Sequence, residues 1–481
     1  MNLIADPWIP VLFENGEAKL IGLEQFYRES ETIRDLNVNP PQRIALMRLL
    51  LCITQAALDG PENEEEWKTC RNRIIPKSLD YLSTRNDKFE LYGDQPFLQV
   101  KALKAINNAV IDKLDFGLAA GNNATLFDHE AIKEGRGHID AWKILMLLTY
   151  QCFSPGGKIG QTEWSRALSL PKNGTSEHSP CLESSPIHLI LRGENVLQTI
   201  SLNLLTKKQV KELPNSTWGV PIWDAFPEKQ NDENAHQTVR SYLGRLIPLS
   251  RGILIAKGES QMTLVNGLAY PKLPEGREPM LCVVIKGAGK QQRVGYVNLS
   301  LVRHVWRELG SLLCVGTTSN ENGALALKNC ANISGAVVDF WTGGLVADKG
   351  KILDTAEWNF SIPLSMLGEA EMKKYSDGVA LANAGEWGLK SAVKSYSKNL
   401  KSESGGYSRK AMVHYWSRLD SSYQMLVDIA SNGERNLDDW RALLRRAMHD
   451  AFEQACPHET PRQIQAFVLA KKLLKIKEKT K

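Results

Sequence analysis

The sequence lacks the patterns that hold structural metals or carry out common hydrolytic chemistry. Its eight cysteines include no CxxC pair, which argues against a zinc ribbon, and their spacing suggests no disulfide framework. Neither GxSxG nor HExxH occurs, and no GxGxxG follows a predicted strand. We therefore expect no catalytic centre, no metal and no cofactor, and we expect the cysteines to be reduced and mostly buried.

Long apolar runs are also few. The longest, Ile44 to Leu58, is interrupted by Arg48, and it falls short of the roughly 20 residues that cross a bilayer. It predicts a buried core helix closed by Gly60 and Pro61. The first residues carry Asp6 and no basic region ahead of a long apolar run, which argues against a secretory signal. These absences predict a cytoplasmic protein with no membrane contact.

Positive charge is unevenly distributed along the chain. The net charge of +5 is too small to establish a polyanionic partner by itself. Residues 363–481 hold 20 Lys and Arg against 14 Asp and Glu, whereas the rest of the chain holds 39 against 40. The whole excess of positive charge therefore lies in the C-terminal quarter.

The first three quarters of the chain mix strand and helix patterns in an irregular order. Because the 481 residues exceed the roughly 250–300 at which single cores stop growing, we expect more than one domain. The pattern predicts an α+β protein with a large, irregular mixed α/β N-terminal domain over residues 1–362. The expected strands are 187–191, 282–285 and 294–297, with a hairpin at 340–353, and the expected helices are 44–58, 139–150 and 301–313.

Residues 363–481 show helical periodicity only. Leu389, Val393, Tyr396 and Leu400 step by four, three and four, as one face of an amphipathic helix requires. Short separators between such segments predict an antiparallel, basic four-helix bundle. The expected helices are 389–400, 412–430, 437–451 and 460–477.

Cations on these helices fall in lines apart from the apolar faces. Spacing by four places each set along one helix surface, which suits contact with a phosphate backbone, although solvated faces carry such runs equally often. The sets are Lys390, Lys394 and Lys398; Arg441 and Arg445; and Lys471, Lys475 and Lys479.

The loop at 121–130 carries the most chemically suggestive side chains. Asp128 and His129 could be metal ligands and Glu130 a base, but adjacent residues point in different directions, and the nearby His138 has no companion carboxylate at ligand spacing. The loop could equally form local backbone hydrogen bonds, or contact nucleic acid through Phe127.

Two further elements could meet a ligand through their backbone. The loop at 154–161 holds three glycines and Lys158, and glycine allows close backbone approach. It lacks the GxxxxGK[ST] order of a phosphate-binding loop, and an ordinary turn is as consistent with it. The hairpin at 340–353 has a polar tip at Asp348, Lys349 and Gly350 that could enter a duplex or simply face solvent.

Taken in order, these landmarks resemble the CasA family, the large subunit of the type I-E CRISPR surveillance complex Cascade. The resemblance covers nearly the full length of the chain, and the order of the motifs makes it more specific than any one of them. The matching segments are Met1-Asn2-Leu3, Trp8-Ile9-Pro10-Val11, Gln95-Pro96-Phe97-Leu98-Gln99, the loop from Asn123 to His129, Gly156-Gly157, Val265-Asn266-Gly267-Leu268, Gly343-Gly344 and the closing helical bundle.

The resemblance implies a subunit that is not an enzyme. Such a subunit scans duplex DNA for a short protospacer-adjacent motif, helps to open the duplex, stabilises the R-loop and recruits a separate helicase-nuclease for antiviral defence. Its implied partners are the crRNA-bearing backbone, small and handle-binding subunits of Cascade, and double-stranded target DNA. In RNA-guided systems base pairing reads the sequence, while the protein reads the adjacent motif and the backbone.

The resemblance also assigns roles to particular residues. Gly157, with Gly156 and Lys158 beside it, would lie against the DNA minor groove. The bundle cations would hold the backbone of the displaced strand. The loop residues Leu126, Phe127 and Asp128 would lie near the guide handle and the target strand.

Two implied positions depart from the family pattern. The duplex-opening wedge is commonly a glutamine, whereas Lys349 stands at the matching position here, between Asp348 and Gly350. A groove-reading lysine is expected shortly before Val265; a count without gaps reaches Ser260, so Lys257 is the candidate only with a short gap.

Two other functions remain open on the sequence. The first is a metal-dependent nuclease or phosphohydrolase that uses Asp128 and His129. The second is a scaffold whose basic bundle binds proteins only.

Overall fold

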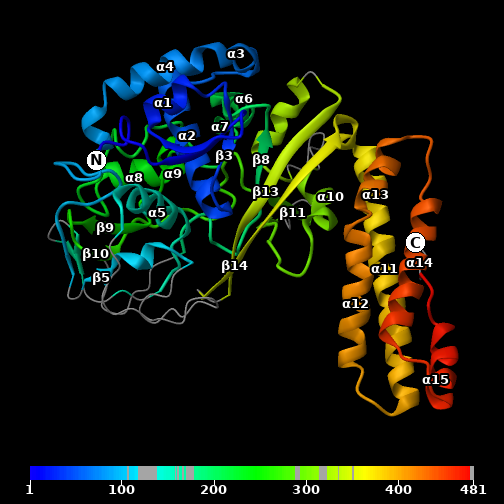
Figure 1. Cartoon of the computed structure of the whole chain (residues 1–481). Coiled ribbons are helices and arrows are strands. Elements are labelled where there is room, and N and C mark those ends of the chain that lie inside the picture. The colour runs from blue at the N-terminus through cyan, green and yellow to red at the C-terminus, as the bar shows by residue number, and fades with distance from the viewer. Residues whose placement is uncertain are drawn as a thin grey trace. The chain divides into compact units, whose positions relative to one another are not determined.

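The chain folds into two compact units. The first comprises Met1–Leu301 and Glu321–Ser361, and the second comprises Val302–Asn320 and Ile362–Lys481 (Figure 1). No described helix is both long enough and apolar enough to cross a membrane. This computed structural model describes residues 1–105, 108–117, 138–157, 159, 162–164, 167–168, 178–287, 293–313, 322–333, 335–348 and 351–476.

The strands described in the first unit form several small sheets instead of one large one. Their orders are β2-β1-β3, β5-β10-β9, β4-β6-β7, β14-β13-β8 and β11-β12. This irregular arrangement, together with the helical C-terminal part, confirms the expected α+β class. The strands are β1 (Ile9–Phe13), β2 (Ala18–Ile21), β3 (Ile33–Leu36), β4 (Leu103–Ala105), β5 (Ala109–Val110), β6 (Thr162–Trp164), β7 (Ala167–Leu168), β8 (His188–Arg192), β9 (Arg251–Ile255), β10 (Gln261–Asn266), β11 (Val283–Lys286), β12 (Arg293–Tyr296), β13 (Val337–Asp348) and β14 (Lys351–Pro363).

The helices of the first unit surround one apolar core that draws residues from most of its length. Among the described residues, short 3-10 segments at Asn86–Phe89, Ile111–Leu114 and Leu325–Asn332 accompany them. The α-helices are α1 (Leu23–Arg28), α2 (Pro40–Leu58), α3 (Glu64–Thr69), α4 (Arg71–Ser83), α5 (Asp140–Phe153), α6 (Val196–Asn203), α7 (Lys207–Lys211), α8 (Glu233–Arg240) and α9 (Tyr242–Leu246).

Helix α2 is the buried core helix that the apolar run predicts. Asn39 and Gln42 form a reciprocal capping box at its start, with Pro40 at the first helical position. Apolar side chains are buried all around the helix, as expected for an element enclosed in a core. It ends at Leu58, and Asp59 then takes a left-handed conformation.

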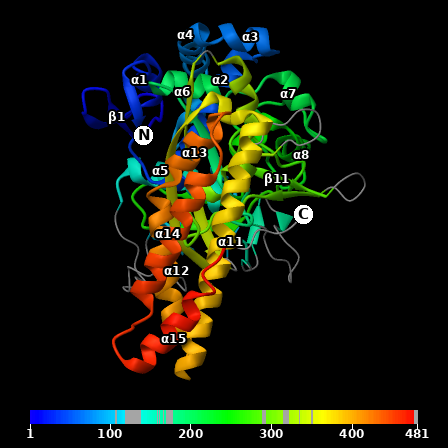
Figure 2. The same ribbon diagram turned by 90° about the vertical axis from the view of Figure 1, so that its right-hand side faces the viewer.

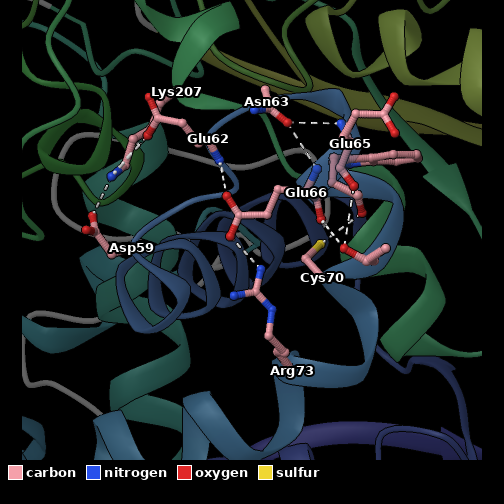
Figure 3. Close-up of polar contacts among 10 residues, drawn as sticks. Asp59, Glu62, Asn63, Glu65, Glu66, Cys70, Arg73 and Lys207 are labelled. Carbon is pink, nitrogen blue, oxygen red and sulfur yellow. Dashed lines mark hydrogen bonds and ion pairs between the residues drawn. The ribbon is translucent and has the colours of Figure 1, made fainter.

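A polar network fixes the turn that leads from α2 into α3 (Figure 3). The Asn63 side chain accepts hydrogen bonds of 3.1 Å from the backbone N–H groups of Glu65 and Glu66, which caps α3. The Glu66 carboxylate accepts from the Glu62 N–H at 2.8 Å and from Arg73 of α4 at 2.5 Å. These contacts join the end of α2 to α3 and α4.

The expected hairpin at 340–353 is confirmed as the long strands β13 and β14. Strand β13 pairs antiparallel with β8, with Gly343 opposite His188. A Cβ added to Gly344 would lie 2.8 Å from the carbonyl oxygen of Pro186, so a side chain there would collide with backbone. The glycine pair therefore permits close packing at the base of the hairpin. The tip residues Lys349 and Gly350 lie outside the described residues.

The second unit is built around one long helix. Helix α11 contacts α12, α13, α14 and α15 along its length, and Figure 2 shows α11, α12 and α14 running side by side. The 3-10 segments Val305–Glu308 and Leu364–Leu367 complete the unit. The helices are α10 (Leu309–Leu312), α11 (Glu369–Leu400), α12 (Gly405–Asp420), α13 (Tyr423–Ser431), α14 (Asp438–Ala455) and α15 (Pro461–Lys471).

The expected bundle helices differ from the observed ones in their bounds. The first, expected at 389–400, begins at Glu369 as α11, and the one expected at 437–451 ends at Ala455 as α14. The run 412–430 is broken at Ser421 and Ser422, so residues 405–431 form α12 and α13. The Ser421 hydroxyl donates to the carbonyl oxygen of Arg418 at 2.9 Å, a local bond that competes with continued helix. The last helix begins as expected at the capping box of Thr460, but it ends at Lys471.

The expected helix at 301–313 is wrong in extent. Only Val305–Leu312 is helical, first as 3-10 and then as α10. Hydrogen bonds to later helices of the second unit fix the conformation of this segment. The Trp306 indole donates to Asp420 at 2.7 Å, and the Tyr375 hydroxyl donates to the Trp306 carbonyl at 2.8 Å. The segment therefore anchors itself to helices that lie later in the chain.

Candidate nucleic-acid interface

The glycine loop leaves the C-terminus of α5. Ser154 ends the helix, and its hydroxyl lies 2.6 Å from that of Ser179. Gly156 is half-buried, whereas Gly157 is exposed with a φ of +134°, a conformation that L side chains rarely adopt. Among the described residues, an added Cβ at Gly157 would meet no atom within 4 Å beyond its chain neighbours. The loop thus presents backbone to solvent, and a side chain there would cost backbone strain without a clash.

Side chains from other segments of the first unit hold this loop in place. The guanidinium of Arg251, at the start of β9, donates to the carbonyl oxygen of Pro155 and to Asn266 Oδ1, the latter at 3.2 Å. Arg251 is only 3% exposed, and burial lowers the pKa of its guanidinium. The Gly156 N–H donates to Nδ1 of His178 at 2.9 Å. The two residues that precede the exposed glycine are therefore each held by a side chain from another segment.

The Asn266-Gly267 pair singled out in the sequence lies in this support. Gln230 donates to both of its carbonyl oxygens, at 2.8 and 2.9 Å. A Cβ at Gly267 would come within 2.2 Å of the Leu249 carbonyl oxygen, so only glycine fits. Sequence reasoning missed Arg251, although a lone charged residue at the start of an apolar strand was a signal that could have identified it.

Lys257 and the glycine loop lie at different ends of one β-ribbon. Arg251 pairs with Asn266 at one end of β9 and β10, and Ile255 pairs with Met262 at the other. Lys257 is exposed in the turn beyond Ile255. Strand geometry separates it from Arg251 by roughly 20 Å along the ribbon. The structure therefore does not bring Lys257 beside the part of the loop that Arg251 holds.

The other predicted loop residues are placed only in part. Asp348 is exposed at the end of β13, where the backbone of Ala347 exchanges hydrogen bonds with the Ser185 hydroxyl at 2.9 and 3.2 Å. This contact fixes the strand just before the tip. Lys158, Lys349 and Gly350, together with the loop residues Leu126, Phe127, Asp128, His129 and Glu130, lie outside the described residues.

His138 has no companion carboxylate at ligand spacing in the sequence, but the fold brings it one from a distant segment. His138 Nε2 lies 2.5 Å from Asp112 Oδ1, and the imidazole stacks on Trp142 at a centroid distance of 3.6 Å. The partner is 26 residues earlier in the chain and was not recognised because it lies in another element. The pair explains His138 as a hydrogen-bonded residue at the start of α5.

On α11 the cationic stripe is exposed as expected. Lys390, Lys394 and Lys398 all face solvent. Lys390 is paired with Glu386 at 2.6 Å and lies 5.7 Å from the ring of Trp387, which is 70% exposed. An exposed aromatic ring among cations suits contact with unpaired bases and phosphates.

The remaining cations differ in their accessibility. Arg441 is half-buried and donates to Asp438 at 3.1 Å, and Lys471 donates to Glu453 at 3.0 Å. Arg445 and Lys475 are exposed, and Lys479 lies outside the described residues. Among the four of these cations that the structure describes, Arg445 and Lys475 are the more accessible to a phosphate backbone.

Comparison with known proteins identifies the family. The family model described as CRISPR-associated protein Cse1 matches residues 2–451. A protein of Thermus thermophilus described as CasA/Cse1 is 27% identical over 490 residues, which cover 94% of this chain and 91% of that protein.

Solved structures share the fold over nearly the whole chain. The crystal structure of Thermobifida fusca Cse1 is 18% identical, covers 98% of this chain and 97% of its own, and has a TM-score of 0.80. The crystal structure of Thermus thermophilus CasA is 22% identical, covers 98% of both chains and has a TM-score of 0.77. Because the family model spans most of the sequence, the chain belongs to the CRISPR-associated Cse1 family, and its resemblance to the CasA large subunit of Cascade is confirmed.

Proposed function

We propose that this chain is the non-catalytic large subunit of a crRNA-guided Cascade complex that reads a protospacer-adjacent motif in duplex DNA. A chain with the same fold, 17% identical with a TM-score of 0.76, is part of a CRISPR RNA-guided surveillance complex. The partners are the crRNA-bearing backbone, small and handle-binding subunits, the target duplex, and a separate helicase-nuclease that this subunit recruits for cleavage.

The glycine loop is the observation that carries this proposal. Gly157 exposes its backbone in a conformation suited to glycine, and Pro155 and Gly156 are fixed from behind by Arg251 and His178. A preformed loop without a protruding side chain at Gly157 can approach the narrow minor groove closely. The minor groove offers a degenerate pattern of donors and acceptors, so such a reader tolerates several related motifs.

Duplex opening and strand retention belong to the hairpin and the second unit. The hairpin tip, with Asp348, Lys349 and Gly350, acts as the wedge at the motif. The cations Lys390, Lys394, Lys398, Arg441 and Arg445 hold the displaced strand through its phosphates. Phosphate contacts carry no sequence information, so this retention is independent of the motif and stabilises the R-loop. Leu126, Phe127 and Asp128 contact the guide handle and target strand.

A specific observation favours the scaffold function as the second candidate. Ile464, Val468, Leu469 and Leu473, on α15 and just beyond it, are between 44% and 52% exposed. Ile464 and Val468, four residues apart, share one face of the helix, and exposed apolar side chains that gather on one face are typical of protein contacts. A protein-binding scaffold would use this surface and would need no DNA.

Salt dependence and cleavage assays separate these functions. We expect the complex reconstituted with this chain to bind guide-matched duplex DNA with an affinity that falls steeply between 50 and 200 mM salt, and to leave the DNA uncut with Mg²⁺ or Mn²⁺ when the helicase-nuclease is omitted. An affinity insensitive to salt, or unchanged when this chain is omitted, would favour the scaffold. Metal-dependent cleavage abolished by Asp128→Ala or His129→Ala would establish the nuclease instead.

A further inference from the structure

A fully buried cluster of metal-binding side chains lies in the first unit, away from the exposed loops. Cys181 precedes β8, His188 begins β8, and Glu278 precedes β11. One ligand atom from each of the three residues lies within 4.8 Å of the other two, and all three residues are buried. The residues are far apart in the sequence, so the absence of a CxxC pair gave no indication of the cluster.

His188 is one of several buried polar side chains that have an atom without a hydrogen bond among the described residues. Its side chain is 0% exposed, and among the described residues neither ring nitrogen has a hydrogen-bond partner. An unsatisfied buried polar group calls for an explanation, and an unseen ion is one of those that apply. Nε2 points toward Glu278 Oε1 at 3.7 Å, which is too long for a hydrogen bond. Zinc bonds of about 2.0–2.3 Å in a tetrahedral site separate neighbouring ligand atoms by about 3.5 Å, which is close to this spacing.

The surroundings of Glu278 suit a metal ligand. Arg48 of α2 donates to Oε2 of Glu278, which leaves Oε1 toward His188. The guanidinium also donates to the carbonyl oxygens of Leu246 and Arg245, at 2.6 and 2.5 Å, so Arg48 is itself held in place. Metal-ligating carboxylates are commonly oriented by such outer partners.

A second buried thiol lies near Cys181 in the fold. Cys152 is in the last turn of α5, and its carbonyl oxygen accepts a hydrogen bond from the Cys181 N–H at 3.2 Å. Cys152 lies outside the group of three residues whose ligand atoms meet within 4.8 Å.

We propose that Cys181, His188 and Glu278 bind a structural Zn²⁺ ion. Thiolate and imidazole donors favour zinc over magnesium or calcium, which take oxygen ligands. One thiolate and one carboxylate would balance the two positive charges of the ion. The proposal departs from the sequence-based expectation of no metal and does not depend on DNA binding.

The ion would lie between the supports of both exposed elements. Cys181 donates its N–H to the carbonyl oxygen of Cys152, which lies three residues before Pro155 of the glycine loop, and His188 pairs with Gly343 at the base of the hairpin. Bonds to one ion would fix the segment before β8 relative to β8 and to the segment before β11. Because all three ligands are buried, the ion has a structural role.

Metal content of the full-length protein tests the proposal. We expect about one zinc per chain by mass spectrometry after purification without chelators or a polyhistidine tag. Cys181→Ser and His188→Ala should each lose most of this zinc, whereas Cys330→Ser, which alters another buried cysteine of the same unit, should retain it. Zinc retained in both ligand variants would place the metal elsewhere and overturn the proposal.

The wild-type protein decides the question even if the ligand variants fail to fold. Protein produced with cobalt in place of zinc should show visible bands of a tetrahedral ion and near-ultraviolet absorption from sulfur-to-cobalt charge transfer. Wild-type protein with neither zinc nor these cobalt bands would overturn the site. So would a thiol titration of denatured protein that finds Cys152 and Cys181 joined as a disulfide.

Discussion

The guanidinium of Arg251 donates a hydrogen bond to the carbonyl oxygen of Pro155, a residue 96 positions earlier in the chain. This bond links the first residue of β9 to the residue just before the Gly156-Gly157 pair. It places a buried cation behind an exposed stretch of backbone. The shape of the proposed DNA-reading loop therefore depends on a residue that does not itself reach the surface.

Replacing Arg251 should loosen the loop. Arg251→Met removes the donors to Pro155 and Asn266, and buried groups left unpaired cost about 1–3 kcal/mol of stability. We expect this loss in chemical denaturation and a several-fold weaker binding of motif-bearing duplex by the assembled complex. Arg245→Met is the matched control, because Arg245 is also buried and donates to Arg240 and Ser216. Equal loss of motif binding in both variants would refute a positioning role for Arg251.

A side chain at Gly157 should strain the backbone of the loop without causing a steric clash. The φ of +134° makes Gly157→Ala unfavourable by about 1–3 kcal/mol. We expect the loop to relax into another conformation and motif binding to fall, with a Tm lowered by a few degrees. Gly16→Ala is the matched control. Gly16 also has a positive φ, of +86°, and an added Cβ there would meet no described atom within 4 Å beyond its chain neighbours. If both variants bind the motif as the wild type does, the glycine loop is not the reader.

Reversing the α11 stripe should weaken retention of the displaced strand. Lys390, Lys394 and Lys398 are exposed, and the triple change to Glu should lower affinity at low salt and flatten its salt dependence. Motif preference should stay the same, because phosphate contacts are sequence-independent. Protection of the displaced strand from single-strand-specific nuclease measures the effect. Arg409, Lys410 and Arg418 on α12 supply a control with the same charge change; an equal effect there would indicate net charge alone.

Trp306 should matter for the second unit although it precedes the bundle by many residues. It is 2% exposed and lies 6.2 Å from the rings of both Trp416 and Tyr423. Trp306→Ala should cost about 3–5 kcal/mol of unfolding free energy. A fragment of residues 362–481 lacks this anchor and should be less stable than one that also carries residues 302–320. Equal stability of the two fragments in denaturant would show that the segment is dispensable.

Acidification should weaken the network around Glu66. The Arg73 hydrogen bond, with that from the Glu62 N–H, lowers the pKa of Glu66 below its unfolded value of about 4.5. The contribution is present above that unfolded value and is lost as the pH falls through the folded one. Because Glu66 is largely solvated, we expect less than about 1 kcal/mol. Denaturation curves at pH 6 and pH 3 should differ less for Glu66→Gln than for the wild type; identical differences would contradict this role.

Sequence reasoning predicted the elements whose signals are local. The apolar run that ends at Leu58 is enough to predict a buried helix. Thr460 and Pro461 predict a helix start, because the capping hydrogen bonds are made within one turn. The glycines of the loop and the strand–turn–strand pattern of the hairpin indicated these two elements, and the resemblance to the family added their roles. In each case the information lies within about a dozen residues.

Contacts between distant residues could not be predicted in this way. Arg251 meets Pro155, and Trp306 meets Asp420, 114 residues later. Cys181, His188 and Glu278 converge from three segments with no shared spacing. Such pairs depend on how the whole chain packs, and a single sequence carries no signal that joins them.

The most direct test is a binding selection with a library of duplexes randomised beside the guide-matched segment. The complex that contains this chain should enrich one short set of motifs there, and the complex reconstituted without it, or with Gly157→Ala, should lose that enrichment. The same motifs enriched in the absence of this chain would contradict the account, because another subunit would then read the motif.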